Sequence, residues 1–278
     1  MNRFFTALDV LILALLTNLA LAQTAFAQQI GTIGIGDITV SAAQNESLTK
    51  QTILAAYENR INSALVDTRK FTVLNHQALE ARLANQGLTL DGYYDGEYRK
   101  NGIFDQFGLD YIFKLDISKF SLTSAKQGNA KSATVNLEYQ MFGVADLTQD
   151  FQASISIQVA AETGAESTQQ LFDRALEKSV VRLTQHLTTT LFPIRVVKRS
   201  EDLEFTLNYG KGYLEVGDSL SVYADDTAIA LGSSGEPIGS PIAVLKIISV
   251  DQKFALARAL NGENAVEKGL PVYLQRIN

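Results

Sequence analysis

The sequence predicts an α/β domain, in which helices pack on a mixed sheet, followed by a small all-β domain that resembles a barrel. Two observations carry this prediction. Up to about residue 191, strand-like segments, in which every second residue is apolar, alternate with segments whose apolar residues repeat at helical spacing. From residue 201 onward, short apolar segments are joined by glycine-rich turns, and no helical stripe appears. The predicted domains are residues 28–197 and 203–278, with a short charged link at 197–202.

Composition excludes several classes of function. The chain has 278 residues, of which 46% are hydrophobic and 19% charged, enough to build one large or two ordinary globular domains. Its net charge of -6 gives no general attraction to nucleic acid or anionic lipid. It has no cysteine and only two histidines, His76 and His186. We therefore expect no disulfide, metal or cofactor site, no nucleic-acid partner and no enzymatic activity.

The first 27 residues have the features of a secretory signal peptide. Asn2 and Arg3 give a basic start, residues 10–22 an apolar core, and residues 25–27 the small-x-small cleavage motif Ala-Phe-Ala. A competing motif lies at residues 20–22. Because the apolar run is short for a bilayer span and no cysteine is available for acylation, we expect a periplasmic protein that is neither membrane-inserted nor a lipoprotein.

The first domain begins with two strand–helix pairs. Residues 29–40 carry isoleucine and valine at mostly alternate positions, which predicts a buried strand. A helical stripe over residues 48–66 follows, and then a short strand at 70–74. Asn75 suits the cap of a further helix, which stops at Gly87.

The rest of the first domain consists of three strands and a long helix. Residues 111–120 alternate between apolar and polar, and residues 133–144 and 151–161 have the pattern of a hairpin. Ser167 and Gln170 have the spacing of a capping box, which opens a helix that Pro193 ends.

The second domain contains five predicted strands. They cover residues 205–209, 219–224, 243–250, 254–260 and 271–277. Closure into a barrel would remove sheet edges that otherwise invite aggregation, so we expect a partly closed barrel.

Several segments resemble known periplasmic families. Residues 63–74 resemble the helix-to-strand segment of the CsgG-like and TolB amino-terminal-like domains, and residues 107–113 resemble their entry into the next strand. Residues 207–210, 214–223 and 247–260 resemble the small β domain that ends the flagellar protein FlgT. The chain departs from CsgG in having no cysteine to acylate, and nothing in it matches the extra amino-terminal domain of FlgT.

The resemblance implies a non-enzymatic assembly or scaffold protein. Such a protein would act through contacts with cell-envelope proteins in a secretion, flagellar or cell-wall machine, and self-association into a ring is one form that the assembly could take. The alternative is a periplasmic small-ligand or glycan-binding module, which needs a pocket lined by aromatic and a few polar groups. A third class, a carboxylate-dependent hydrolase, needs two acids close together in a cleft.

The candidate partner-binding residues are Tyr93, Tyr94 and Tyr98. They lie in the polar, glycine-containing stretch at residues 90–101, which we expect to form a loop. Tyrosine rings on a loop supply interface anchors at low conformational-entropy cost. The alternative is that these rings fold back on the domain's own core. The glycine-rich loop at residues 232–239 is a second candidate, for which a flexible hairpin tip is the simpler interpretation.

The first testable prediction concerns export. Cleavage after Ala27 should leave a mature periplasmic protein whose amino-terminal sequence begins at Gln28. Edman sequencing of the periplasmic fraction checks this, and recovery of the full-length chain in the membrane pellet would contradict it.

Overall fold

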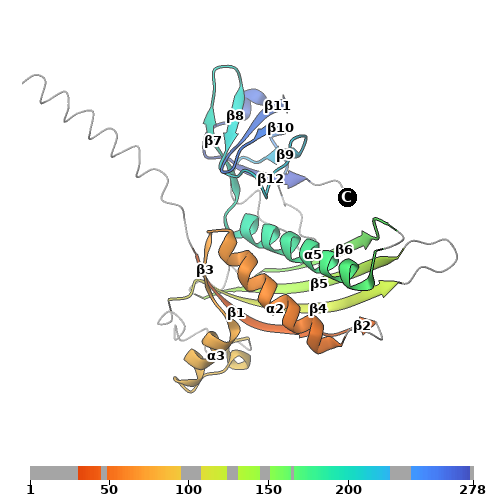
Figure 1. Cartoon of the computed structure of the whole chain (residues 1–278). Helices are drawn as coiled ribbons and strands as arrows, with labels where there is room; N and C mark the ends of the chain where they lie inside the picture. Colours follow the sequence, from red (N-terminus) through yellow and green to blue (C-terminus); the bar gives the residue numbers. More distant parts are fainter. Residues whose placement is uncertain are drawn as a thin grey trace, which may run out of the picture. The chain divides into compact units, whose positions relative to one another are not determined.

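The computed structural model describes residues 31–44, 49–94, 108–123, 131–144, 151–163, 166–225 and 239–275. Over these ranges the predicted fold class is confirmed: a mixed sheet with helices is followed by a closed all-β barrel (Figure 1). No helix within the described ranges is both long and apolar enough to cross a membrane. The predicted signal peptide lies outside them.

The mixed sheet contains parallel and antiparallel pairs. Its strands run in the order β3-β1-β4-β5-β6, and the short β2 pairs with β4 beyond the end of β1. β1 is parallel to β3 and to β4, whereas β4, β5 and β6 are antiparallel neighbours. The strands are β1 (Gly31–Val40), β2 (Ala43–Gln44), β3 (Phe71–Leu74), β4 (Tyr111–Thr123), β5 (Ser132–Gly143) and β6 (Phe151–Ala160).

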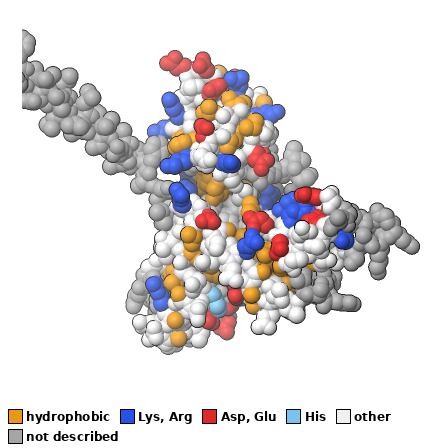
Figure 2. Space-filling view, in the orientation of Figure 1, with side chains coloured by type: hydrophobic (Ala, Val, Ile, Leu, Met, Phe, Trp, Pro, Cys, Tyr) orange, Lys and Arg blue, Asp and Glu red, His pale blue; other side chains and the backbone are white. Residues whose placement is uncertain are grey.

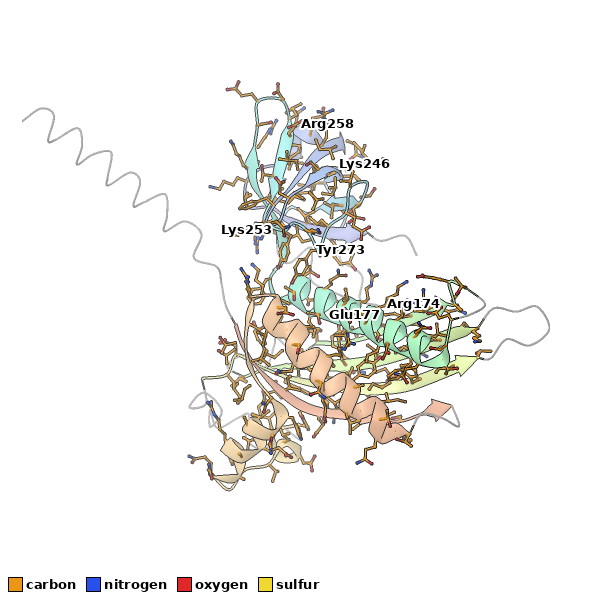
Figure 3. The ribbon with its side chains drawn as sticks, viewed as in Figure 1. Arg174, Glu177, Lys246, Lys253, Arg258 and Tyr273 are labelled. Carbon is orange, nitrogen blue, oxygen red and sulfur yellow. The ribbon has the colours of Figure 1, made fainter. Side chains whose placement is uncertain are left out.

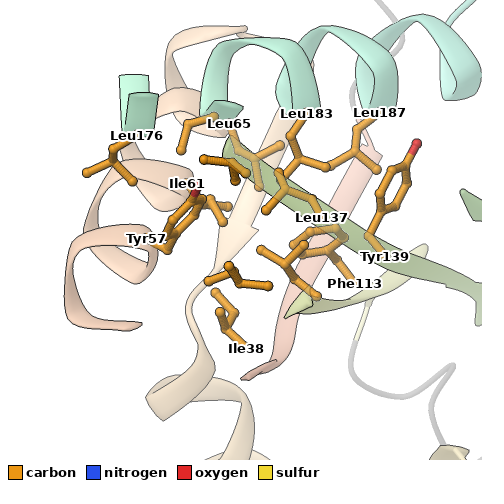
Figure 4. Close-up of a cluster of buried hydrophobic side chains, with 14 of the residues drawn as sticks. Ile38, Tyr57, Ile61, Leu65, Phe113, Leu137, Tyr139, Leu176, Leu183 and Leu187 are labelled. Atoms are coloured by element: carbon orange, nitrogen blue, oxygen red, sulfur yellow. The ribbon is translucent and has the colours of Figure 1, made fainter. Parts of the chain in front are cut away.

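Two long helices cover one face of this sheet. α2 (Lys50–Asp67) and α5 (Thr168–Leu191) pack side by side on it (Figure 1). Their apolar stripes and the helix-facing sheet residues form one buried cluster (Figure 4). The labelled members of the cluster are Ile38, Tyr57, Ile61, Leu65, Phe113, Leu137, Tyr139, Leu176, Leu183 and Leu187.

The two short helices α3 (His76–Ala84) and α4 (Leu90–Tyr94) lie on the opposite face. Ile33 and Ile35 of β1 point into the cluster beneath α2 and α5, so Gly34 between them faces the other way. There, a Cβ on Gly34 would lie 3.1 Å from a methyl carbon of Leu79 on α3. A glycine therefore lets α3 approach the sheet closely.

Local signals fix the ends of the helices. The Ser167 hydroxyl accepts from the Gln170 amide while the Gln170 side chain accepts from the Ser167 amide, so the predicted capping box is present. The predicted Asn75 cap is also present, with its side-chain oxygen 2.9 Å from the Ala78 nitrogen. α5 ends two residues before Pro193, which cannot continue a helix.

One polar pair lies inside the helix layer. The Tyr57 hydroxyl of α2 is 2.6 Å from the Ser179 hydroxyl of α5, and both residues are buried. Because Ser179 donates to the Leu176 carbonyl at 2.8 Å, Tyr57 is the donor to Ser179. Burial raises the pKa of Tyr57 and keeps it a donor. The pair satisfies two buried hydroxyls and links the two helices.

The second part of the chain is a closed six-stranded barrel. Its strands run in the order β10-β11-β8-β7-β12-β9 and then return to β10. A single apolar cluster fills the interior, contributed by alternate residues of every strand. The strands are β7 (Ile194–Arg199), β8 (Glu204–Leu207), β9 (Ser219–Val222), β10 (Ala243–Val250), β11 (Ala255–Asn261) and β12 (Pro271–Gln275).

The structure differs from the predicted link at residues 197–202. β7 begins directly after Pro193 and pairs with β8 and β12, so residues 194–199 belong to the barrel sheet and the segment that follows is a hairpin turn. Only two side chains of this strand point into the barrel, those of Ile194 and Val196. The sequence pattern is polar because the strand also contains Arg195, Lys198 and Arg199. That the two parts fold separately stays a prediction.

The helix layer gives the second testable prediction. Leu183 of α5 is 0% exposed in the cluster, so Leu183→Ala should lower the free energy of unfolding by about 2 to 5 kcal/mol through lost contacts and a residual cavity. Val181 on the same helix is 41% exposed, and Val181→Ala should change stability by no more than about 0.5 kcal/mol. Urea denaturation of both variants measures the difference. Equal losses would contradict the assignment of the buried stripe.

Candidate functional site

The structure places Tyr93 in the core. The predicted loop is wrong over residues 90–94, which form α4, and residues 95–101 lie outside the described part of the chain. Tyr93 is 0% exposed, packs with Leu79 and Ile112, and donates its hydroxyl to the Gly143 carbonyl at 3.2 Å. The single helical turn is stabilised by these tertiary contacts rather than by its own propensity, which is why the sequence pattern missed it.

Tyr94 is half-buried beside Tyr93. Its hydroxyl accepts from the Asp37 amide at 3.1 Å, and the Lys114 ammonium lies 4.4 Å from its ring centroid. The interpretation in which the rings pack on their own domain therefore describes Tyr93 and Tyr94. Tyr98 and residues 232–238 lie outside the described ranges, and a role of the three tyrosines as partner anchors stays a prediction.

A second candidate is the contact between Tyr139 of β5 and His186 of α5. The Tyr139 hydroxyl bonds to Nδ1 of His186 beneath the helix layer. Burial, aided by the positive charge of Arg182 one turn away, lowers the pKa of His186 to about 4. Burial also raises the pKa of Tyr139. Both groups are therefore neutral at physiological pH, and the pair is a satisfied polar contact within the fold.

The other histidine, His76, lies next to an acidic residue of its own helix. His76 at the start of α3 lies 3.4 Å from Glu80 on the same helix. Among the residues that the structure describes, no group of three or more histidine, aspartate or glutamate side chains is arranged to hold a metal ion.

The exposed apolar side chains concentrate on the barrel. Across the described ranges, seven large hydrophobic residues are exposed, and five of them lie in the barrel part of the chain. Figure 2 shows apolar side chains there among lysines and arginines. The five are Val216, Ile242, Ile248, Phe254 and Leu260.

Two of these residues are placed by β-bulges. In the β10–β11 ladder, Lys246 lies directly opposite Arg258. The register skips Ile248 on one side of this pair and Leu260 on the other, so each is the extra residue of a bulge. Ile248 is 38% and Leu260 61% exposed. We name these two residues and the basic pair between them the β10–β11 patch, which consists of Lys246, Ile248, Arg258 and Leu260 (Figure 3 labels the two basic residues).

The patch has an excess of positive charge. Like charges directly opposite each other on neighbouring strands repel. Arg258 is partly neutralised because its guanidinium lies 2.9 Å from the carboxylate of Glu204 on β8. Over the described part of the chain, Lys246 forms no ion pair. An anionic group next to Lys246 would therefore relieve the repulsion.

The sequence holds a signal for this patch that the prediction did not use. Ile247 and Ile248 are consecutive apolar residues, which breaks the inward–outward alternation of a strand. Such a break is typical of a bulge that turns a side chain outward. Which residues then share one face with Ile248 depends on the strand register, and register is a tertiary property.

Comparisons with known proteins give distant structural similarity. No family model matches the chain, and no curated protein matches it. Among solved structures, the lipoprotein GNA1162 from Neisseria meningitidis is 12% identical, with 55% of this chain and 96% of that chain covered at a TM-score of 0.36. The hypothetical protein CT253 from Chlamydia trachomatis is 12% identical, with 56% and 96% covered at a TM-score of 0.38. The LpoB carboxy-terminal domain from Salmonella enterica is 16% identical, with 46% and 84% covered at a TM-score of 0.28.

The third testable prediction concerns pH. The pKa of His186 is about 4 in the fold and ordinarily 6.5, so the unfolded chain binds more protons between these values. The contribution of His186 to stability is therefore full above about pH 6.5 and falls by about 2 to 3 kcal/mol as the pH drops to 4.

Denaturant unfolding of the wild type and of His186→Gln from pH 7.5 to 4 measures this contribution. Groups that titrate in both proteins cancel in the difference, which should shrink steadily below pH 6.5. A difference that stays constant over the whole range would contradict a partly buried His186 that is neutral in the fold.

Proposed function

We propose that this protein is a non-enzymatic binding protein of the bacterial cell envelope that acts through protein–protein contacts in an envelope assembly. The signal-like amino terminus, the acidic balance and the cysteine-free composition support export and a soluble working state. The low pKa of His186 and the raised pKa of Tyr139 argue against a role of these two side chains in proton transfer.

The main support for the proposal is the exposure of aliphatic side chains in the β10–β11 patch. Exposed aliphatic side chains on a small domain are typical of interaction sites when they occur together rather than singly. Here the exposed Lys246 and Arg258 lie between Ile248 and Leu260 along the strand pair, and the alkyl stems of such side chains add apolar area to a surface. The partner that fits this surface is a protein segment that presents carboxylates next to apolar side chains.

Both bulges lie on the same strand pair and on either side of one cross-strand basic pair. A bulge interrupts the ladder and leaves its extra residue unpaired, a defect that serves to aim a side chain or to end pairing. Here both extra residues are hydrophobic and exposed. The two bulges turn aliphatic residues outward and do not add them to the barrel interior. A contact surface therefore explains the bulges better than interior packing does.

The fourth testable prediction uses site-specific cross-linking. A photoreactive amino acid at Leu260 of the exported protein should cross-link to a protein partner in intact cells, and the charge reversals Lys246→Glu and Arg258→Glu together should weaken that contact about tenfold or more. Thermal unfolding of the double variant checks that the barrel is still folded. Val66 of α2, which is 50% exposed, is the matched position for a control cross-linker and for Val66→Asp.

Two results would overturn the proposal. One is equal cross-linking from Leu260 and Val66, and the other is a partner that the charge reversal leaves unaffected. The alternative function, a small-ligand or glycan-binding module, predicts no protein cross-link at Leu260 and an unfolding temperature that rises with a sugar or small ligand.

A further inference from the structure

The strand β6 ends the mixed sheet with an open edge. It pairs with β5 through ten consecutive residues, Phe151 to Ala160, without a register shift. No other strand of the described chain pairs with it, and it lies at the border of the sheet in Figure 1. In an antiparallel pair, every second residue turns its backbone N–H and C=O away from the neighbour. A row of backbone donors and acceptors therefore faces outward.

Over residues 151–159, the described part of the chain gives this edge few of the usual protections against pairing with another chain. Exposed edges are normally short, bulged, or marked by charged residues or proline. β3 at the opposite edge follows this rule, because it has only four residues. β6 is long and regular, and residues 151–160 include no charged residue and no proline. A partner strand is therefore the expected protection.

The carboxyl end of β6 is already occupied. Arg174 of α5 donates to the Ala160 carbonyl at 2.6 Å and pairs with Glu162 and with Glu166, the latter at 2.9 Å. This charged cluster, at the end of α5 marked by Arg174 in Figure 3, closes the strand at Ala160. The edge that remains is residues 151–159, and its middle residue is Ile155.

The same residue is the centre of a nearly palindromic sequence. Around Ile155, Ser154 mirrors Ser156 and Gln152 mirrors Gln158, while small Ala153 mirrors large Ile157. In an antiparallel pair of two identical strands centred on Ile155, each residue lies opposite its mirror residue. Hydroxyl would then face hydroxyl, amide would face amide, and apolar would face apolar. The free edge and the sequence symmetry share one centre, although they are independent observations.

We propose that β6 of a second copy of this chain occupies the edge, antiparallel, with the two-fold axis at Ile155. The pairing joins the two mixed sheets into one continuous sheet. Because the same surface is used by both copies, the contact is isologous and closes as a dimer rather than continuing into a ring or fibre.

The helix-facing row of β6 explains what pairing adds beyond hydrogen bonds. Phe151, Ala153, Ile155 and Ile157 pack against the cluster beneath α5 but stay only partly buried. In the paired form, each contacts an apolar residue of the second copy, which removes further apolar surface from water. On the other face, Ser154 and Ser156 are exposed. Ser154 lies opposite Glu138 of β5, and the Ser156 hydroxyl donates to the Asn136 side-chain oxygen at 2.9 Å.

The exposed serines allow a charge-swap experiment on the mature chain. Ser154→Lys with Ser156→Lys places lysines opposite each other across the axis and should raise the dimer dissociation constant by about tenfold. Ser154→Glu with Ser156→Glu should do the same. A mixture of the two double variants should restore the dimer, because each lysine then lies opposite a glutamate.

The matched control has the same two positions with opposite signs. Ser154→Lys with Ser156→Glu places a lysine opposite a glutamate in the proposed register, so this variant should dimerise alone. A register shifted to place Ser156 opposite its own copy would make the control repulsive. Sedimentation velocity gives the association state, and circular dichroism should show unchanged folding because both side chains are exposed.

Each outcome decides the proposal. A wild-type dimer that the lysine pair weakens, and that the lysine and glutamate variants restore when mixed, supports it. A monomeric wild type overturns it, and so does any oligomer that the lysine pair leaves unchanged. Failure of the mixed variants to associate, or failure of the control to dimerise, overturns the Ile155-centred register.

Discussion

The fold depends on one packing arrangement: the apolar stripe of α5 lies against one face of the mixed sheet, with α2 beside it. The capping box at Ser167 fixes where this 24-residue helix starts, and Pro193 fixes where the chain must leave it and enter β7. Buried residues along the whole length of α5 meet β5 and β6, and the hydroxyl pair of Tyr57 and Ser179 links the helix to α2. A change in the start or the phase of α5 would move both its contact with the sheet and the first strand of the barrel.

The same arrangement determines which surfaces stay available. α2 and α5 cover one face, and α3 and α4 cover part of the other near β1. Over the residues that the structure describes, the antiparallel end of the sheet therefore keeps a polar face that no helix covers and a free edge at β6. The barrel has no free edge, and its available surface is the outer face, where two bulges expose Ile248 and Leu260. The two candidate surfaces therefore arise for different reasons: one from an unpaired strand, and the other from defects in a closed sheet.

Much of the fold is predictable from the sequence, because strong periodic patterns mark β1, β4, β5, β6, α2 and α5, and side-chain caps at Asn75 and Ser167 mark helix starts. The missed elements depend on tertiary contacts. The sequence pattern divides β7 between the end of the first domain and a charged link at residues 197–202, because only Ile194 and Val196 point inward. It predicts a loop at α4, because a single helical turn has no periodic signal. Tyr93 shows the same limit at the candidate site: its burial against Leu79 and Ile112 cannot be inferred from its polar sequence neighbours. The β10–β11 patch also needs the register of two strands, which no local pattern specifies.

Hydrogen exchange followed by mass spectrometry, at several concentrations of the mature chain, tests the central claim most directly. This claim has two parts. The packing of α5 and α2 on the mixed sheet is the most stable region of residues 31–191, and β6 is an edge strand of that sheet that pairs with a second copy of the chain. It predicts the slowest exchange in α5, β4 and β5, and protection over residues 151–159 that rises with protein concentration while that of β3 does not change. Fast exchange throughout α5, or exchange in β6 that is independent of concentration, would contradict it.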